Sequence, residues 1–176
     1  MIRSIRHSEK EDLSTLHAVI DEARHRMAKL GIDQWQDGYP ADALLLEDAA
    51  ARHGYVLMQD GEIEGYCVLS LAEEPCYNEI DGAWESTAAD SVVVHRTAVS
   101  DRAQGTGLGR YMLEEAAKFA KANGRHYVRL DTHPGNTVMR GFVEHLGYSY
   151  TGVVIYDDIT TGEPRRVCYE KRMEEK

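Results

Sequence analysis

The chain has 176 residues, of which 43% are hydrophobic and 28% charged, and its formal net charge is −10. This size and composition predict one soluble globular domain over residues 1–176. The acidic balance disfavours nucleic-acid binding, which needs a basic surface, and no apolar run approaches the roughly 18 residues of a membrane span. The first six residues alternate apolar and polar side chains and lack the apolar block of a signal peptide. We therefore expect a cytoplasmic protein.

Three cysteines, Cys67, Cys76 and Cys168, are an odd number and widely separated. Their spacing matches neither a disulfide framework nor a pair of zinc ligands. We expect reduced thiols and no metal site.

The first quarter of the chain predicts a strand and two helices. Residues 2–6 alternate as a strand does. A capping box of Ser8 and Glu11 then predicts a helix that ends at Gly31. Apolar side chains spaced by three and four residues form its buried face: Leu13, Leu16, Ile20, Ala23, Met27 and Leu30. Residues 32–40 read as a loop, and a second helix is predicted from Pro40 to about Gly54.

A hairpin and a long loop come next. Residues 55–58 and 63–71 have strand character and flank the turn pair Asp60-Gly61. Residues 72–90 are rich in acidic and aromatic side chains and are predicted to form a long loop, a kind of segment that is often functional.

The second half predicts a strand, a helix and a parallel strand. Residues 92–99 are the most apolar strand, residues 108–123 have a helical period with Glu114 and Lys118 paired outside, and residues 127–132 form another strand. A helix over 134–146 should bury Val138, Met139, Phe142 and Leu146. Strands over 148–156 and 166–172 follow, around a turn at Thr161-Gly162. The chain therefore predicts one α/β domain with a mixed sheet.

A glycine-rich turn links the apolar strand to the helix at 108–123. Its residues are Gln104, Gly105, Thr106, Gly107, Leu108 and Gly109. Unpaired N–H groups at a helix N-terminus bind anions, and glycines let an anion approach the backbone. Arg110 stands where the dinucleotide fingerprint needs a glycine, and the turn lacks the G-K-S/T of the triphosphate loop. An NAD-dependent dehydrogenase is therefore improbable.

What remains is Q-x-x-G-x-G after a valine-rich strand, with a later pattern of Asn136, Met139, Gly147 and Tyr148. In these features the chain resembles the GNAT superfamily of N-acetyltransferases, over nearly its whole length. The resemblance implies a mixed, mostly antiparallel sheet in which a central parallel strand pair is splayed around the coenzyme, flanked by about four helices. It also implies acetyl-CoA as co-substrate.

The resemblance carries coenzyme contacts onto specific positions. The backbone from Gln104 to Gly109 would hold the pyrophosphate. The strand end would pair with the pantetheine arm through Thr97, Ala98 and Val99. Asn136 would also contact that arm, although a helix cap is an alternative role for it, and both roles could hold.

Catalysis needs a proton acceptor for the amine and a donor for the thiolate. We favour His95 as the base, because it lies on the same strand face as Thr97 and Val99 and is neutral near pH 7. Glu85 and Glu79 are the alternatives. The family's usual acid, a tyrosine, is replaced by Val143. His133, Tyr148, Tyr150 or solvent could substitute.

The acceptor pocket should come from the loop between the first two helices and from the acidic loop. The expected residues are Gln34, Trp35, Asp37, Tyr39, Tyr77, Glu79, Trp84 and Glu85. Aromatic rings and carboxylates suit an amine cation. The sequence therefore predicts an N-acetyltransferase that acts on a primary amine of a small molecule or peptide by direct transfer in a ternary complex. The alternative is a non-catalytic acyl-CoA-binding sensor or regulatory module. An edge strand near residues 167–169 could pair across a homodimer.

Overall fold

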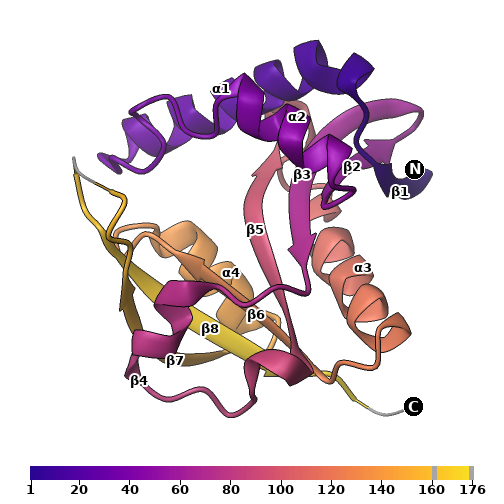
Figure 1. The fold of residues 1–176 in the computed structure, drawn as a ribbon. Helices are drawn as coiled ribbons and strands as arrows, with labels where there is room; N and C mark the ends of the chain where they lie inside the picture. Colours follow the sequence, from indigo (N-terminus) through magenta and orange to yellow (C-terminus); the bar gives the residue numbers. More distant parts are fainter. Residues whose placement is uncertain (160–161, 175–176) are drawn as a thin grey trace.

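The computed structural model describes residues 1–159 and 162–174 and shows a sheet with helices on both faces (Figure 1). In these ranges the sheet has eight strands, in the order β1-β2-β3-β5-β6-β8-β7-β4. The strands are β1 (Arg3–His7), β2 (Gly54–Gln59), β3 (Glu62–Ser70), β4 (Asp81–Gly82), β5 (Ser91–Val99), β6 (Tyr127–Thr132), β7 (Ser149–Ile155) and β8 (Arg165–Arg172). Among these eight strands, only β5 and β6 pair in parallel. The sheet is therefore mixed and mostly antiparallel, as the resemblance implies.

Four α-helices cover the sheet in the described residues. They are α1 (Leu13–Lys29), α2 (Asp42–Ala50), α3 (Leu108–Ala122) and α4 (Thr137–His145), with short 3-10 turns η1 (Lys10–Asp12), η2 (Pro75–Glu79), η3 (Ala88–Asp90) and η4 (Asp101–Ala103). No helix among these is both long and apolar enough to cross a membrane.

Two hydrophobic clusters place the helices on opposite faces. Leu16, Ile20 and Ala23 of α1 pack with α2 against β2, β3 and the end of β5. On the other face, apolar side chains of α3 and α4 pack against β5, β6 and β8, with Leu108, Met112 and Val143 among them. Figure 1 shows α1 and α2 together above the sheet, with α3 at its side.

Strand β5 contributes to both clusters, with Ala98 in the first and Val92 and Val94 in the second. These residues are even numbers of positions apart, so alternation alone would place them on one face, and an irregularity in the β3–β5 pairing moves Ala98 to the other. The prediction that His95 shares a face with Thr97 and Val99 is wrong for the same reason.

The parallel pair β5–β6 opens after four residue couples. The last of these is Val94 with Leu130. Beyond it β5 stays with β3 and β6 stays with β8, so the two strands diverge. A bulge in β5 accompanies this split, since Arg96 and Thr97 together oppose one residue of β3 and Arg96 has a φ of +51°. The split leaves a gap at the carboxyl end of both strands.

The hairpin, the strand over 127–132 and the helix after the glycine turn were predicted correctly. Gly31 ends the first helix region with a φ of +71°, but the helix start was misplaced. Ser8 still belongs to the sheet edge, because its N–H donates to the carbonyl of Gly54. The capping box is therefore formed by Glu9 and Asp12.

Other details of the sequence prediction were wrong. Helix α2 starts at Asp42, two residues after Pro40, and ends at Ala50, with Gly54 already in β2. Leu30 and Val138 are 58% and 66% exposed. Lys118 pairs with Glu115 instead of Glu114.

The predicted edge strand is also wrong, because β8 lies between β6 and β7. Pairing across a dimer through residues 167–169 is therefore excluded. Thr161, half of the predicted turn pair, lies outside the described residues.

Candidate active site

A cavity of about 1460 Å³ lies at the open end of the β5–β6 split. Its walls come from α1 and the loop after it, from β5 with the start of α3, and from β6, α4 and the β7–β8 loop. Asp33 of the α1–α2 loop accepts a hydrogen bond of 2.9 Å from the N–H of Glu163, which ties that loop to the β7–β8 loop. The cavity therefore lies between the two halves of the sheet.

The glycine turn forms one end of the cavity. Gly105 and Gly107 have φ values of +72° and +87°, a conformation that glycine adopts without strain. Gly107 is the N-cap of α3, and no side chain in the described residues caps this helix. The first N–H groups of α3 are therefore left for another partner, and the helix dipole favours an anion there. The turn fits a phosphate group.

Side chains of the turn hold its shape. The Thr106 hydroxyl donates to the carbonyl of Ala103 at 2.8 Å, and Arg3 donates to the Thr106 carbonyl. The Gln104 amide donates to the carbonyl of Val99 at 3.1 Å. The N–H groups of Gln104 and Thr106 donate to the carbonyls of Asp101 and Ala103 at 3.2 and 3.3 Å, so, contrary to what the resemblance implies, these two are not available to a phosphate. The N–H groups of the three glycines and of Leu108 are left as the available part of the turn. Thr97, Ala98 and Val99 all line the cavity beside it.

Asn136 lies on the opposite wall, at the start of α4. Its side-chain oxygen accepts a hydrogen bond of 3.1 Å from the N–H of Met139, which confirms the helix-cap role. Its side-chain nitrogen remains available to a ligand, so the cap is compatible with the predicted coenzyme contact.

His95 lies on β5, one residue past the last β5–β6 couple. Its Nε2 is 3.3 Å from Oε2 of Glu74, and its side chain is 19% exposed. Burial lowers the pKa of His95 to about 4, against a smaller raising effect from Asp131. The imidazole is therefore neutral at pH 7.

Asp131 lies on β6, directly past the same couple. Its Oδ2 accepts two hydrogen bonds, from the hydroxyl of Tyr77 at 2.7 Å and from that of Tyr156 at 2.9 Å. The pKa values of both tyrosines are raised, first by burial and then by the charge of Asp131. Both hydroxyls are therefore protonated donors at neutral pH. Burial, followed by repulsion from Asp131, also raises the pKa of Glu74.

Five of the eight predicted acceptor residues line the cavity: Gln34, Trp35, Asp37, Tyr39 and Glu79. Tyr77, Trp84 and Glu85 do not. Tyr77 is 3% exposed and reaches the site only through Asp131. Trp84 donates through Nε1 to the carbonyl of Tyr77 and lies under the guanidinium of Arg129, with Cζ 4.3 Å from the ring centroid. Trp84 therefore supports the site from behind.

None of the alternative catalytic residues Glu85, His133 and Tyr148 is among the lining residues of the cavity. Glu85 accepts a hydrogen bond from Tyr127 at the far end of β6, roughly 16 Å from the cavity end at about 3.3 Å per strand residue. His133 contacts Asp33, with Nε2 2.9 Å from Oδ1, and does not reach the cavity itself.

The tyrosines considered as the acid also lie away from the cavity. Tyr148 is 5% exposed in the main hydrophobic core. Val143, at the family's tyrosine position, is fully buried, and Tyr150 is 55% exposed against Tyr169.

Sequence reasoning missed Asp131, Glu74 and Tyr156. The carboxyl end of β6 was identified, but His133 was chosen there, whereas strand alternation turns Asp131 to the same face as its neighbour His95. Glu74 has no sequence signal, because it lies in an irregular loop. Cys76 also lines the cavity, and burial, followed by the charge of Glu74, raises its pKa to about 12.

Comparisons with known proteins agree with this geometry. Residues 14–148 match the family model described as acetyltransferase (GNAT) family. A GNAT-family acetyltransferase from Streptococcus agalactiae is 30% identical, with a TM-score of 0.86 over 98% of this chain and 96% of that one.

Two more distant structures share the fold. A Salmonella typhimurium protein, described as an acetyltransferase and solved with its cofactor acetyl-CoA, is 20% identical, with a TM-score of 0.65 over 99% of this chain and 95% of that one. The ribosomal-protein-S18-alanine N-acetyltransferase from Escherichia coli is 18% identical, with a TM-score of 0.65 over 99% and 96%. Comparison with curated protein sequences finds no significant match. The family model and the 30% identical structure together show that this chain belongs to the GNAT family of acetyltransferases.

Proposed function

We propose that this chain transfers the acetyl group of acetyl-CoA to a primary amine. The observation that carries the proposal is the uncapped N-terminus of α3, with positive φ at Gly105 and Gly107, beside the open β5–β6 split. The turn suits a pyrophosphate, and the gap between the strands suits an extended arm that can hydrogen-bond to β5. Acetyl-CoA supplies an activated thioester.

In the overall reaction, the acetyl carbon forms a bond to the amine nitrogen and its bond to sulfur breaks. The ammonium group loses two protons. One is released to solvent, and the other protonates the leaving thiolate. The protein must therefore remove protons from the amine and provide one to sulfur.

His95 is the proposed proton acceptor. If its Nε2 carries a proton toward Glu74, its Nδ1 is free to accept one, and the nearby carboxylate stabilises the imidazolium that forms. Its low pKa keeps the imidazole neutral and able to accept a proton, but also makes it a weak base. Glu74, whose pKa is raised, is suited to share that proton.

Direct transfer is favoured over a route through an acylated cysteine. Cys76 is the cysteine that lines the cavity in the described residues. With a pKa of about 12, its thiol is protonated at neutral pH and is a poor nucleophile. The amine therefore attacks the thioester itself.

The test is release of coenzyme A thiol from acetyl-CoA with a broad panel of primary amines, together with calorimetric binding of coenzyme A. We expect saturable thiol release with at least one amine. Coenzyme binding without any transfer would instead support the sensor alternative, for which the buried Val143 at the tyrosine position is the argument.

A further inference from the structure

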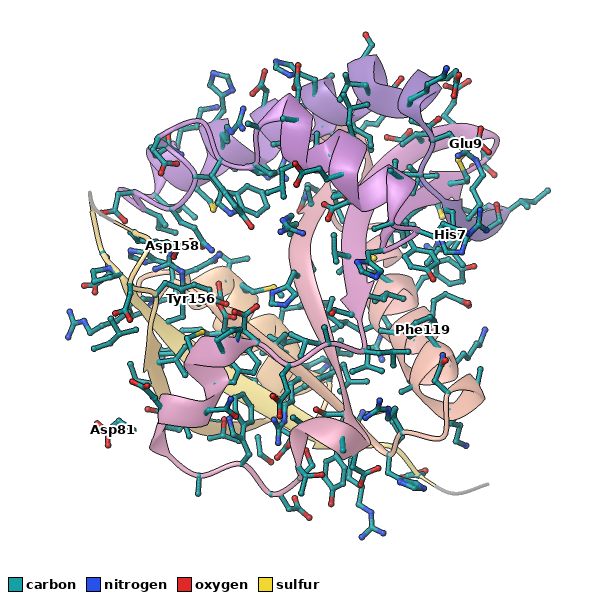
Figure 2. All side chains as sticks on the ribbon, in the orientation of Figure 1. His7, Glu9, Asp81, Phe119, Tyr156 and Asp158 are labelled. Atoms are coloured by element: carbon teal, nitrogen blue, oxygen red, sulfur yellow. The ribbon has the colours of Figure 1, made fainter. Side chains whose placement is uncertain are left out.

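The acceptor side of the cavity carries negative charge. Asp131, Glu74 and Asp158 all line it. They lie close enough to interact, because the charges of both aspartates raise the pKa of Glu74. Figure 2 shows Tyr156 and Asp158 on the β7–β8 side, below helices α1 and α2. Three carboxylates from three separate segments thus surround one part of the cavity.

Asp131 is held in place without a cation. Both tyrosine bonds fall on Oδ2, so Oδ1 is left without a partner among the described residues. Within the same residues, no lysine, arginine or histidine lies at ion-pair distance from Asp131, and the contact of His95 is with Glu74. A half-buried carboxylate with a free oxygen and two fixed hydroxyl donors is a preformed site for a cation.

The arginines that line this part of the cavity are committed elsewhere. Arg96 binds both carboxylate oxygens of Asp48, at 3.0 and 3.1 Å, and the hydroxyl of Tyr39. Arg166 donates through Nη1 to the carbonyls of Glu163 and Arg165. Neither lies at ion-pair distance from the three carboxylates. Arg166 lies with Cζ 5.9 Å from the ring centroid of Tyr156, and Arg96 lowers the pKa of Glu74 against the larger raising effect of burial, so the two guanidinium groups offset part of this charge. Oδ1 of Asp131 is still open to a ligand.

The reacting nitrogen alone does not balance the remaining negative charge. An amine must be neutral when it attacks the thioester, and the amide product carries no charge. A carboxylate that stays ionised through the reaction therefore needs a cationic group that does not react. Resting on the proposed function, we propose that the acceptor carries a second cationic group, which binds to Oδ1 of Asp131. The hydroxyls of Tyr77 and Tyr156 hold the carboxylate in place through its other oxygen, Oδ2. The negative charge of Asp158 adds to the attraction for the cation.

Three amines with the same four-carbon chain test this proposal. They are 1,4-diaminobutane, butylamine and 4-aminobutanoate, whose far ends are a cation, a methyl group and a carboxylate. We expect kcat/KM for the diamine to exceed that for butylamine by about tenfold or more, with 4-aminobutanoate the poorest. Asp131→Asn should lower the diamine value about tenfold and the butylamine value much less. Asp158→Asn, on an exposed side chain, should reduce the same preference by a smaller factor.

The control is Glu114→Gln, which removes an exposed carboxylate on α3 outside the cavity and should leave the preference unchanged. Equal values for diamine and butylamine would overturn the proposal. So would a preference for 4-aminobutanoate, which would assign Arg166 to a substrate carboxylate, or an equal loss for all three amines in Asp131→Asn.

Calorimetry of the same amines with the coenzyme A complex ranks them without turnover. Tighter binding of the diamine, lost in Asp131→Asn, would support the proposal. A protein that shows this ranking but releases no thiol with any amine would contradict the proposed acetyl transfer alone. Equal binding of the diamine and butylamine would contradict the second cationic group.

Discussion

His95 and Asp131 are the first residues of β5 and β6 beyond the last paired couple, and they lie on the same face of the sheet. Each has a fixed contact outside the two strands, His95 with Glu74 and Asp131 with the two tyrosines. The point at which the sheet opens is therefore also the point at which the titratable groups gather. This relationship explains why a change at one strand end should alter chemistry and not only packing.

Gly107→Ala should weaken coenzyme A binding at least about tenfold. A Cβ at φ +87° costs roughly 1–2 kcal/mol of backbone strain, would contact the Arg3 guanidinium at 3.4 Å and would crowd the N–H groups that face an anion. Gly124→Ala is a matched control, because Gly124 has a φ of +66° with nothing within 4 Å at the other end of α3. Calorimetry measures the affinities. A Gly107→Ala variant that binds coenzyme A as tightly as the Gly124→Ala variant would contradict the anion-binding role of the turn.

Asn136→Ser and Asn136→Ala separate the two roles of Asn136. Serine can cap α4 as asparagine does, whereas alanine should cost about 1 kcal/mol of unfolding free energy. We expect only the alanine variant to be destabilised in urea unfolding, and both variants to bind coenzyme A more weakly. Normal affinity in the serine variant would limit Asn136 to the cap.

The pH dependence of stability should contain a contribution from His95. Its folded pKa of about 4 lies below the unfolded value near 6.5, so the unfolded chain binds the proton more readily. Its destabilising contribution is absent above about pH 6.5 and grows as pH falls toward 4, by up to about 1.4 kcal/mol per unit. His95→Gln should flatten urea-unfolding free energies over that window. An unchanged slope would mean that the imidazole is not buried as neutral.

The pH–rate profile of His95→Gln checks its catalytic role separately. We expect the variant to bind coenzyme A normally and to lose rate mainly at neutral and lower pH, where unprotonated amine is scarce. A wild-type profile would move the base assignment to Glu74.

Arg129 and Glu170 form a buried pair, with side chains 4% and 2% exposed. Glu170 also accepts hydrogen bonds from the N–H groups of Glu85 and Ser86. Glu170→Gln should therefore cost about 3–5 kcal/mol, because it leaves a buried guanidinium uncompensated. Urea unfolding measures the loss, and the exposed Glu114→Gln should show almost none. A loss below about 1 kcal/mol would show that water reaches Arg129.

The sequence predicted the parts of the fold that depend on local pattern. The glycine turn, the hairpin at Asp60-Gly61 and the strand over 127–132 all have signals within a few residues. The glycine-turn end of the candidate site follows from the same local signals. Helix starts were less accurate, because Ser8 is held by a sheet bond to Gly54, 46 positions along the chain.

The end of the candidate site that holds His95 and Asp131 could not be predicted in the same way. Glu74, Asp131 and Tyr156 are brought together by a loop, a strand end and a turn that are far apart in sequence. No period or spacing relates them. Among the chain's 30 acidic residues, Asp131 is distinguished by its tertiary contacts with Tyr77 and Tyr156, and Glu74 by its contact with His95.

Among the residues that the structure describes, the four couples between β5 and β6 are the only ladder that joins the half-sheet β1-β2-β3-β5 to the half-sheet β6-β8-β7-β4. So short a seam makes the two halves candidates for separate cooperative units, which exchange amide hydrogens at different rates. A ligand that hydrogen-bonds within the gap would lengthen the seam. We therefore expect coenzyme A to slow amide hydrogen exchange in both half-sheets and to sharpen thermal unfolding into one transition. Binding of the co-substrate would then make the two half-sheets unfold as one cooperative unit.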